Sequence, residues 1–140
     1  SYDGEWRAGC MQGEGKYLFR DGFTYEGRFE RGKQEGNGVA YYPHGQKYEG
    51  EWKEGRYFSH GETFMLGGSK YKGEFDFGRR SGKGVLTYPS GLNYVGEFFD
   101  GKPHGRGTMS SALTGWAYEG SWEYGFIHGS GSLITPAPEK

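Results

Sequence analysis

The sequence predicts an elongated all-β protein, a twisted antiparallel β-meander made of about six β-hairpin repeats. Two observations lead to this fold class. A Tyr-x-Gly-x-aromatic-x-x-Gly pattern recurs at a nearly fixed step through most of the 140 residues, and a period of this size indicates a stacked array. Within each copy, apolar and charged residues alternate along the chain. This alternation is typical of a half-buried β-strand.

Each copy of the pattern opens with a tyrosine. The opening tyrosines are Tyr2, Tyr25, Tyr48, Tyr71, Tyr94 and Tyr118. Four residues after each of them stands a second ring, Trp or Phe: Trp6, Phe29, Trp52, Phe75, Phe98 and Trp122. A glycine follows three residues later in every copy. We therefore expect an array over residues 2–134, with copies at 2–24, 25–47, 48–70, 71–93, 94–117 and 118–134, and a C-terminal tail at 135–140.

The first strand of a copy places its rings and its charges on opposite faces. In a strand, Tyr48, Gly50 and Trp52 point one way, whereas Glu49 and Glu51 point the other. A helix would scatter these rings, because residues two apart do not share a helical face. The middle glycine recurs in all six copies. We expect it to make room for rings that lean over the bare backbone.

A second strand is predicted in each copy after a Gly-x-Gly motif, which we expect to form a loop with positive φ angles. In the third copy Ser59 takes the place of the first glycine. Turn sequences such as Pro43-His44-Gly45 end the second strand. The fifth copy has one extra residue before Gly115, and we expect a bulge or a longer turn there. Six hairpins give about twelve strands, with Pro136 and Pro138 stopping the last one.

Composition favours an ordered intracellular protein without a large spherical core. Only 33% of the residues are hydrophobic and 29 are glycine, yet 19% are aromatic and the net charge is −1. Aromatic content argues against disorder, and balanced charge argues against nucleic-acid binding. The single Cys10 excludes an internal disulfide and favours a reducing, cytoplasmic compartment. Ser1 lies directly inside the pattern, so we expect the chain to be a fragment of a longer protein.

The repeated unit resembles the MORN repeat. The copies at Tyr25, Tyr48 and Tyr118 begin with Tyr-Glu-Gly, and residues 102–107 are similar to the middle of the unit. Ser59, the extra residue of the fifth copy, and Lys72 and Val95 at a position that is otherwise acidic depart from the pattern. The resemblance implies a single-layer twisted sheet with a grooved surface. It also implies a scaffolding role in cytoskeletal, ciliary or membrane-junction organisation, or a place beside a catalytic domain as an accessory module.

Catalytic chemistry, cofactors and metals are not expected. His104 and His128 occupy equivalent positions, but two strands, ~10 Å, separate such positions, whereas zinc ligands each lie ~2.1 Å from the metal. Residues 78–84 lack the spacing of a phosphate-binding loop. Glutamates 49, 51, 74 and 97 are expected on a solvated face.

A ladder of rings is the first candidate binding surface. If the rings of successive copies align, they form an apolar stripe larger than a monomer normally exposes, and Tyr and Trp favour protein interfaces. We therefore expect a non-catalytic scaffold that holds an extended or helical segment of a protein partner. The alternative is that the rings pack on each other and stabilise the sheet. The predicted contact residues are Tyr25, Phe29, Tyr48, Trp52, Tyr71, Phe75, Tyr94, Phe98, Tyr118 and Trp122.

A row of basic residues is the second candidate surface. A basic residue follows the closing glycine in four successive copies, and others stand nearby. Such an edge can attract anionic phospholipid, although its charges are ~10 Å apart, about one Debye length at 0.1 M salt, so a solvated edge is the alternative. Association of two copies through a terminal repeat is a further alternative. The predicted basic edge consists of Lys33, Arg56, Arg79, Arg80, Lys83, Lys102 and Arg106.

Overall fold

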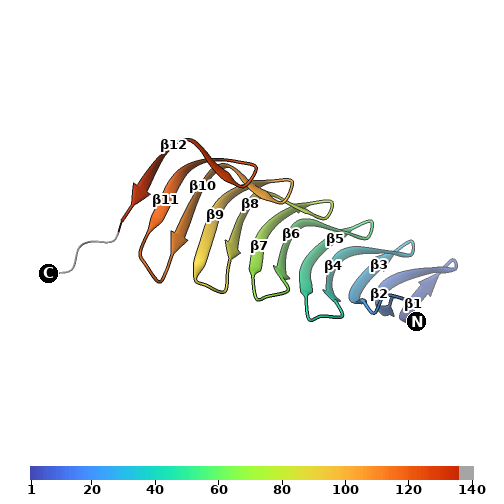
Figure 1. Ribbon diagram of the computed structural model, residues 1–140. Helices are drawn as coiled ribbons and strands as arrows, with labels where there is room; N and C mark the ends of the chain where they lie inside the picture. The colour runs from blue at the N-terminus through green and yellow to red at the C-terminus, as the bar shows by residue number, and fades with distance from the viewer. Residues whose placement is uncertain (136–140) are drawn as a thin grey trace.

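The computed structural model describes residues 1–135 and shows one open sheet of twelve antiparallel strands in sequence order (Figure 1). This confirms the predicted all-β meander of six hairpins. The expected tail, including both prolines, lies outside the described residues except for Thr135. The strands are β1 (Tyr2–Arg7), β2 (Cys10–Leu18), β3 (Thr24–Glu30), β4 (Lys33–Tyr41), β5 (Lys47–Lys53), β6 (Arg56–Phe64), β7 (Lys70–Asp76), β8 (Arg79–Thr87), β9 (Leu92–Phe99), β10 (Lys102–Ser111), β11 (Ala117–Glu123) and β12 (Phe126–Ile134).

Two-residue turns join the strands of each hairpin. In the third copy the turn is Glu54-Gly55, with φ angles of 50° and 80°, as a type I′ turn requires. Strand β6 begins at Arg56, directly after the closing glycine. The expected loop is therefore wrong, because the Gly-x-Gly motif lies inside the second strand. From the second hairpin on, each turn also joins the preceding hairpin, as when the Gly55 amide donates to the Gln34 carbonyl at 3.0 Å.

The Gly-x-Gly motif forms a β-bulge instead of a loop. Gly50 pairs with Gly61, and Trp52 pairs with Tyr57. One residue of β5, Glu51, therefore faces residues 58–60 of β6. Such a bulge bends the strand and increases its twist. The predicted positive φ is confirmed, because the first residue of the motif has φ between 61° and 88° in all six copies.

Longer loops along the other edge connect one hairpin to the next. Five residues separate the last paired positions in most copies, as between Tyr41 and Lys47. In the fifth copy six residues separate Ser110 from Ala117. The Gly115 amide donates to the Ser111 carbonyl inside this loop. The extra residue thus lengthens the turn, as expected.

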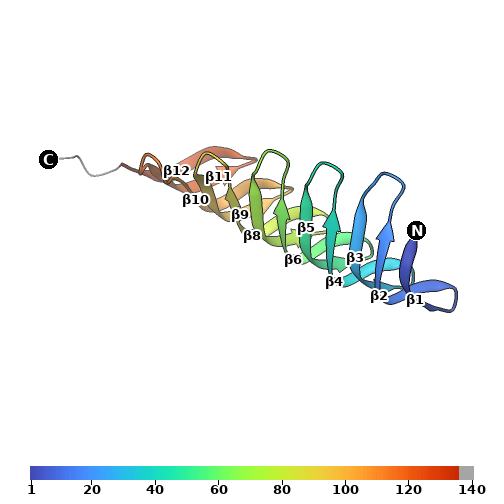
Figure 2. The same ribbon diagram turned by 90° about the horizontal axis from the view of Figure 1, so that it is seen from below.

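Rings from the first strands form the core of the sheet. Tyr25, Tyr48, Tyr71 and Tyr94 are fully buried, because the bent hairpins curl around that face (Figures 1 and 2). Each of these tyrosines meets the ring of its own strand and that of the next copy edge to face, as Tyr48 meets Trp52 at 5.1 Å and Phe75 at 5.3 Å between ring centroids. Such pairs contribute about 0.5–1.5 kcal/mol each beyond burial.

Glycine pairs make room for these rings, as the sequence predicts. Gly73 and Gly84 pair across β7 and β8. A Cβ on Gly73 would lie 2.5 Å from the Cα of Gly84, and one on Gly84 would overlap the Tyr71 ring. The Tyr71 hydroxyl crosses this bare backbone and donates to the Glu74 carbonyl at 2.9 Å.

Candidate binding groove

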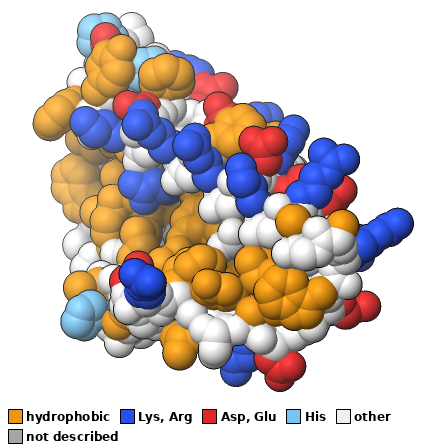
Figure 3. Space-filling view, turned by 90° about the vertical axis from the view of Figure 1, so that its right-hand side faces the viewer, with side chains coloured by type: hydrophobic (Ala, Val, Ile, Leu, Met, Phe, Trp, Pro, Cys, Tyr) orange, Lys and Arg blue, Asp and Glu red, His pale blue; other side chains and the backbone are white. Residues whose placement is uncertain are grey.

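The bent hairpins leave a hollow on the ring face of the sheet. Figure 3, viewed along the array from its N-terminal end, shows hydrophobic side chains gathered in this hollow and Lys and Arg side chains beside them. The cavity within it has a volume of about 410 Å³. We call it the groove. Its lining residues are Tyr42, Gln46, Lys47, Tyr57, Thr63, Phe64, Met65, Leu66, Phe75, Gly78, Arg79, Arg80 and Gly101.

A pair of tyrosines stands at one side of the groove. Tyr42 lies in the loop between β4 and β5, whereas Tyr57 lies in β6, close to the two-residue turn of the following hairpin. Their hydroxyl groups share a hydrogen bond, which ties the loop edge to the turn edge. Tyr57 also stacks on Tyr48 with ring centroids 3.8 Å apart. Burial raises the pKa of both hydroxyl groups, so both stay neutral near pH 7.

Arg80 is the half-buried cation of the groove. Its guanidinium lies 5.6 Å from the Tyr71 ring centroid and 5.7 Å from that of Phe98. One of its amino groups donates to the Gly101 carbonyl at 2.5 Å. Burial lowers the pKa of Arg80, because the charged form is poorly solvated there. The two other cations of the lining have acidic neighbours, since Lys47 lies 3.3 Å from Glu49 and Arg79 pairs with Asp100.

The rings predicted to contact a partner are mostly inaccessible. The four fully buried tyrosines and Phe29, Trp52, Phe75, Phe98 and Trp122 are each at most 7% exposed. Tyr118 is partly buried. A ring without exposed surface cannot touch a partner, so the expectation of an open ring stripe needs correction. These rings instead pack against each other between strands, which was the alternative prediction. Of the ten predicted rings, only Phe75 lines the groove.

The predicted basic edge divides into three places. Lys33, Arg56, Arg79 and Lys102 each follow a two-residue turn and are exposed along one edge. Arg80 lies in the groove, and Arg79 borders the groove from the edge. Lys83 and Arg106 line a separate shallow cavity together with Lys72, Val85 and Val95. One continuous edge of seven cations is therefore wrong, because the side chains of Arg79 and Arg80 leave adjacent positions on opposite faces of β8.

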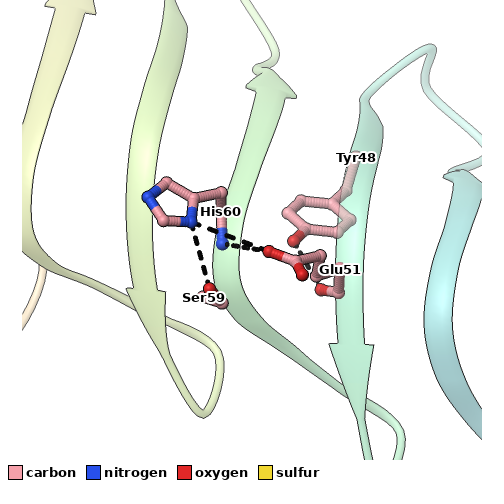
Figure 4. Close-up of polar contacts among 4 residues, drawn as sticks. All are labelled: Tyr48, Glu51, Ser59 and His60. Carbon is pink, nitrogen blue, oxygen red and sulfur yellow. Dashed lines mark hydrogen bonds and ion pairs between the residues drawn. The ribbon is translucent and has the colours of Figure 1, made fainter.

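Glutamates 51, 74 and 97 have a structural role that the sequence did not reveal. The Glu51 carboxylate accepts the His60 amide at 3.0 Å (Figure 4), and Glu74 and Glu97 accept the amides of Lys83 and Arg106 in the same way. The bulge leaves these amides without a strand partner, and the carboxylates satisfy them. These hydrogen bonds are at exposed positions, in agreement with the expected solvated face, and Glu49 is exposed with Lys47 as its ion-pair partner.

Residues 1–135 contain no cluster of three or more His, Cys, Asp or Glu side chains that could hold a metal ion. His104 instead accepts a hydrogen bond from the Tyr124 amide at 3.3 Å, and His128 lies 3.1 Å from Glu123. Within the same residues there is no helix with the length and hydropathy needed to cross a bilayer.

Apart from Phe75, Arg79 and Arg80, the groove side chains were missed because they lie outside the repeated skeleton. Tyr57 occupies a place where the other copies have Met11, Gln34, Arg80, Pro103 and Ile127. Met65 and Leu66 belong to a loop whose sequence differs between copies. The variation of these positions between copies was a signal for the groove. Where a regular repeat varies, one copy can acquire a binding site that the other copies lack.

The family model of the MORN repeat matches residues 2–24, 25–47, 48–62, 71–92, 94–112 and 118–136. A comparison with curated proteins gave no match. The matched segments cover most of the chain and agree with the six hairpins of the sheet. The chain therefore belongs to the family of MORN-repeat proteins.

Proposed function

We propose that this chain is a non-catalytic scaffold that binds a segment of a protein partner in the groove. MORN repeats are non-catalytic modules that generally act as scaffolds for membrane or protein interactions. The observation that carries the proposal is the groove, an apolar hollow with a few convergent polar groups, which is the usual character of a binding site. Tyr42, Tyr57 and Met65 are only partly buried there, so they keep surface for a partner.

The experiment changes the groove without changing the sheet. Leu66 is 66% exposed in the loop beside the groove, and Leu113 is 82% exposed in the loop of the fifth copy, outside it. Leu66→Glu therefore alters the groove and Leu113→Glu is its matched control. Met65→Ser is a second groove variant, because Ser111 occupies the equivalent place in the fifth copy.

Random linear peptides are selected on the wild-type chain, and their dissociation constants are measured by fluorescence anisotropy. We expect Leu66→Glu and Met65→Ser to weaken binding at least about tenfold, since burying an apolar side chain contributes about 1.5–3 kcal/mol. Leu113→Glu should bind as the wild type does. Equal affinities for all four chains would refute the groove as the binding surface. Trp52→Ala is not a suitable groove variant, because Trp52 is 4% exposed and its removal would lower the stability of the sheet.

A second candidate function is association with anionic phospholipid. It is favoured by the four exposed cations Lys33, Arg56, Arg79 and Lys102, one per hairpin along the same edge. Each contributes about 1 kcal/mol near an anionic surface. Co-sedimentation with phosphatidylserine vesicles should then fall when Lys33 and Arg56 are both changed to Glu, and fall further as salt rises. Vesicles that fail to bind the wild type at low salt would exclude this candidate.

A further inference from the structure

Arg80 is the only charged residue at its position in the repeat. The six copies have Met11, Gln34, Tyr57, Arg80, Pro103 and Ile127 there. Elsewhere in the array the fold is thus built with neutral side chains at this place. The guanidinium of Arg80 is not needed to complete a hairpin, and its presence in one copy calls for another reason.

No carboxylate balances this charge in the part of the chain that the structure describes. Ion pairs are present for Lys47, Lys70 and Arg79, whereas the hydrogen-bond partner of Arg80 is the neutral Gly101 carbonyl. A guanidinium carries five N–H donors, and a half-buried cation without a counter-ion is costly. The side chain thus retains charge and donor capacity inside the groove.

A second group in the groove also lacks a partner. The side-chain oxygen of Gln46 is buried without a hydrogen bond among the described residues, and Gln46 lines the same cavity as Arg80. The groove therefore offers one unused acceptor and one unbalanced cation beside an apolar surface. A peptide segment can supply an N–H donor, an anion and an apolar side chain together.

We propose that Arg80 anchors a carboxylate of the bound partner, so that the groove selects an acidic amphipathic segment. An Asp or Glu side chain meets the Arg80 guanidinium, and a bulky apolar side chain of the same segment lies beside Tyr57 and Met65. A carboxylate matches the charge and the planar fork of one guanidinium. A phosphate carries up to two charges, and the other cations of the groove, Lys47 and Arg79, are already next to Glu49 and Asp100.

This inference rests on the proposed function, and peptide selection on the full chain tests both separately. Random linear peptides are selected on the wild type and on Arg80→Gln, and those that bind Leu113→Glu but not Leu66→Glu are counted as groove-dependent. Arg80→Gln keeps the fold, because Gln34 occupies this place in the second copy. Arg56→Gln is the matched control, because Arg56 is exposed at the turn edge and does not line the groove.

We expect groove-dependent peptides of the wild type to share an Asp or Glu at a fixed distance from a large apolar residue. Changing that acid to its amide should weaken binding at least about tenfold to the wild type and to Arg56→Gln, but leave binding to Arg80→Gln nearly unchanged. Groove-dependent peptides without a shared acid, or an equal amide effect on Arg80→Gln, would overturn this inference and leave the proposed function standing.

The absence of any groove-dependent peptide would overturn both proposals. An anionic lipid is the alternative ligand of Arg80, and vesicle binding distinguishes it from a peptide. Binding to phosphatidylserine vesicles that is lost in Arg80→Gln but kept in Arg56→Gln, without groove-dependent peptides, would assign Arg80 to a membrane and refute the acidic segment.

Discussion

Ser59 adopts a backbone conformation that glycine adopts at the equivalent place of the other five copies. Its φ is 61°, and the glycines have φ between 70° and 88°. The left-handed region costs an L-residue about 1–2 kcal/mol, whereas glycine enters it without strain but loses more freedom on folding. The hydroxyl of Ser59 lies 3.0 Å from Nδ1 of His60 at an exposed position (Figure 4), which offsets little of the strain.

Ser59→Gly should therefore raise the free energy of unfolding by about 0.5–1 kcal/mol, the net of relieved strain and lost chain entropy. Urea denaturation followed by circular dichroism measures the change. The reverse substitution Gly82→Ser is the control, and it should lower stability because a Cβ there meets the Glu74 carboxylate. A Ser59→Gly variant less stable than the wild type would contradict the strain at this position.

The bulge carboxylates give a second test at the scale of single residues. Glu74 accepts the Lys83 amide at 2.5 Å, whereas Glu49 is exposed and contacts only the flexible ammonium of Lys47. Glu74→Ala should destabilise the fold by about 1–2 kcal/mol, since it removes a charge-assisted hydrogen bond to the backbone. Glu49→Ala should cost less than about 0.5 kcal/mol. Equal losses of thermal stability in the two variants would rule out the capping role.

At the scale of the hairpin, the paired glycines and the tyrosine above them form one unit. Gly84 lies under the Tyr71 ring, and the ring in turn packs on Phe75 and on Phe98 of the next copy. A displaced Tyr71 ring would thus loosen two hairpins.

Gly84→Ala should lower the free energy of unfolding by about 3 kcal/mol, since overpacking a tight core forces backbone shifts. Gly45→Ala is the matched control: Gly45 has positive φ, but nothing lies within 4 Å of its added Cβ, so only about 1–2 kcal/mol of backbone strain is expected. Hydrogen exchange should show faster opening of β7 to β10 in Gly84→Ala. Unchanged protection of these strands would show that the ring has room to move.

At the scale of the whole molecule, one column of buried phenols runs through the sheet. Burial raises the pKa of Tyr71 and of Tyr94 to about 12, and it raises the pKa of Tyr25 and Tyr48 as well. Unfolded tyrosine ionises near pH 10. The folded chain therefore holds the phenolic protons more tightly than the unfolded chain does.

The contribution of these tyrosines to the free energy of unfolding should be constant below about pH 10. It should fall as the pH rises from about 10 towards 12. Phenolate absorbance and far-ultraviolet circular dichroism, recorded in one titration, should show these tyrosines ionising only as the sheet is lost. Complete ionisation near pH 10 with an intact sheet would contradict their burial.

The fold was predictable from the sequence because its determinants are local. Tyr48, Gly50 and Trp52 already show which face is apolar, and two-residue turns impose the antiparallel order. The bulge was not predictable as a bulge, since a loop and a bulge both call for the positive φ of Ser59 and its equivalents. The hydrogen bond from the His60 amide to Glu51 was not predictable either. It depends on which amide the bulge leaves unpaired, and this is set by the register between the strands.

The candidate site was predictable only in its chemistry. Aromatic residues do form it, but Tyr42 and Tyr57 take the place of the expected Tyr48 and Trp52, because hairpin bending buries the first-strand rings under the next copy. The alternation of apolar and charged residues along one strand does not indicate how the hairpin bends. Arg79 and Arg80 look like one basic cluster in the sequence, yet the pleat directs Arg79 to Asp100 and Arg80 to the rings of Tyr71 and Phe98.

The five junctions between hairpins are nearly interchangeable. At each one a tyrosine meets the Phe or Trp of the next copy, and a turn glycine donates to a carbonyl of the copy before. Removal of residues 48–70 would bring Tyr25 against Phe75 in a junction of the same kind. The shortened chain would fold about 10 Å shorter, but without Tyr57 and Met65. The length of the array is thus set by the number of units, whereas the groove is present only when the third unit is kept.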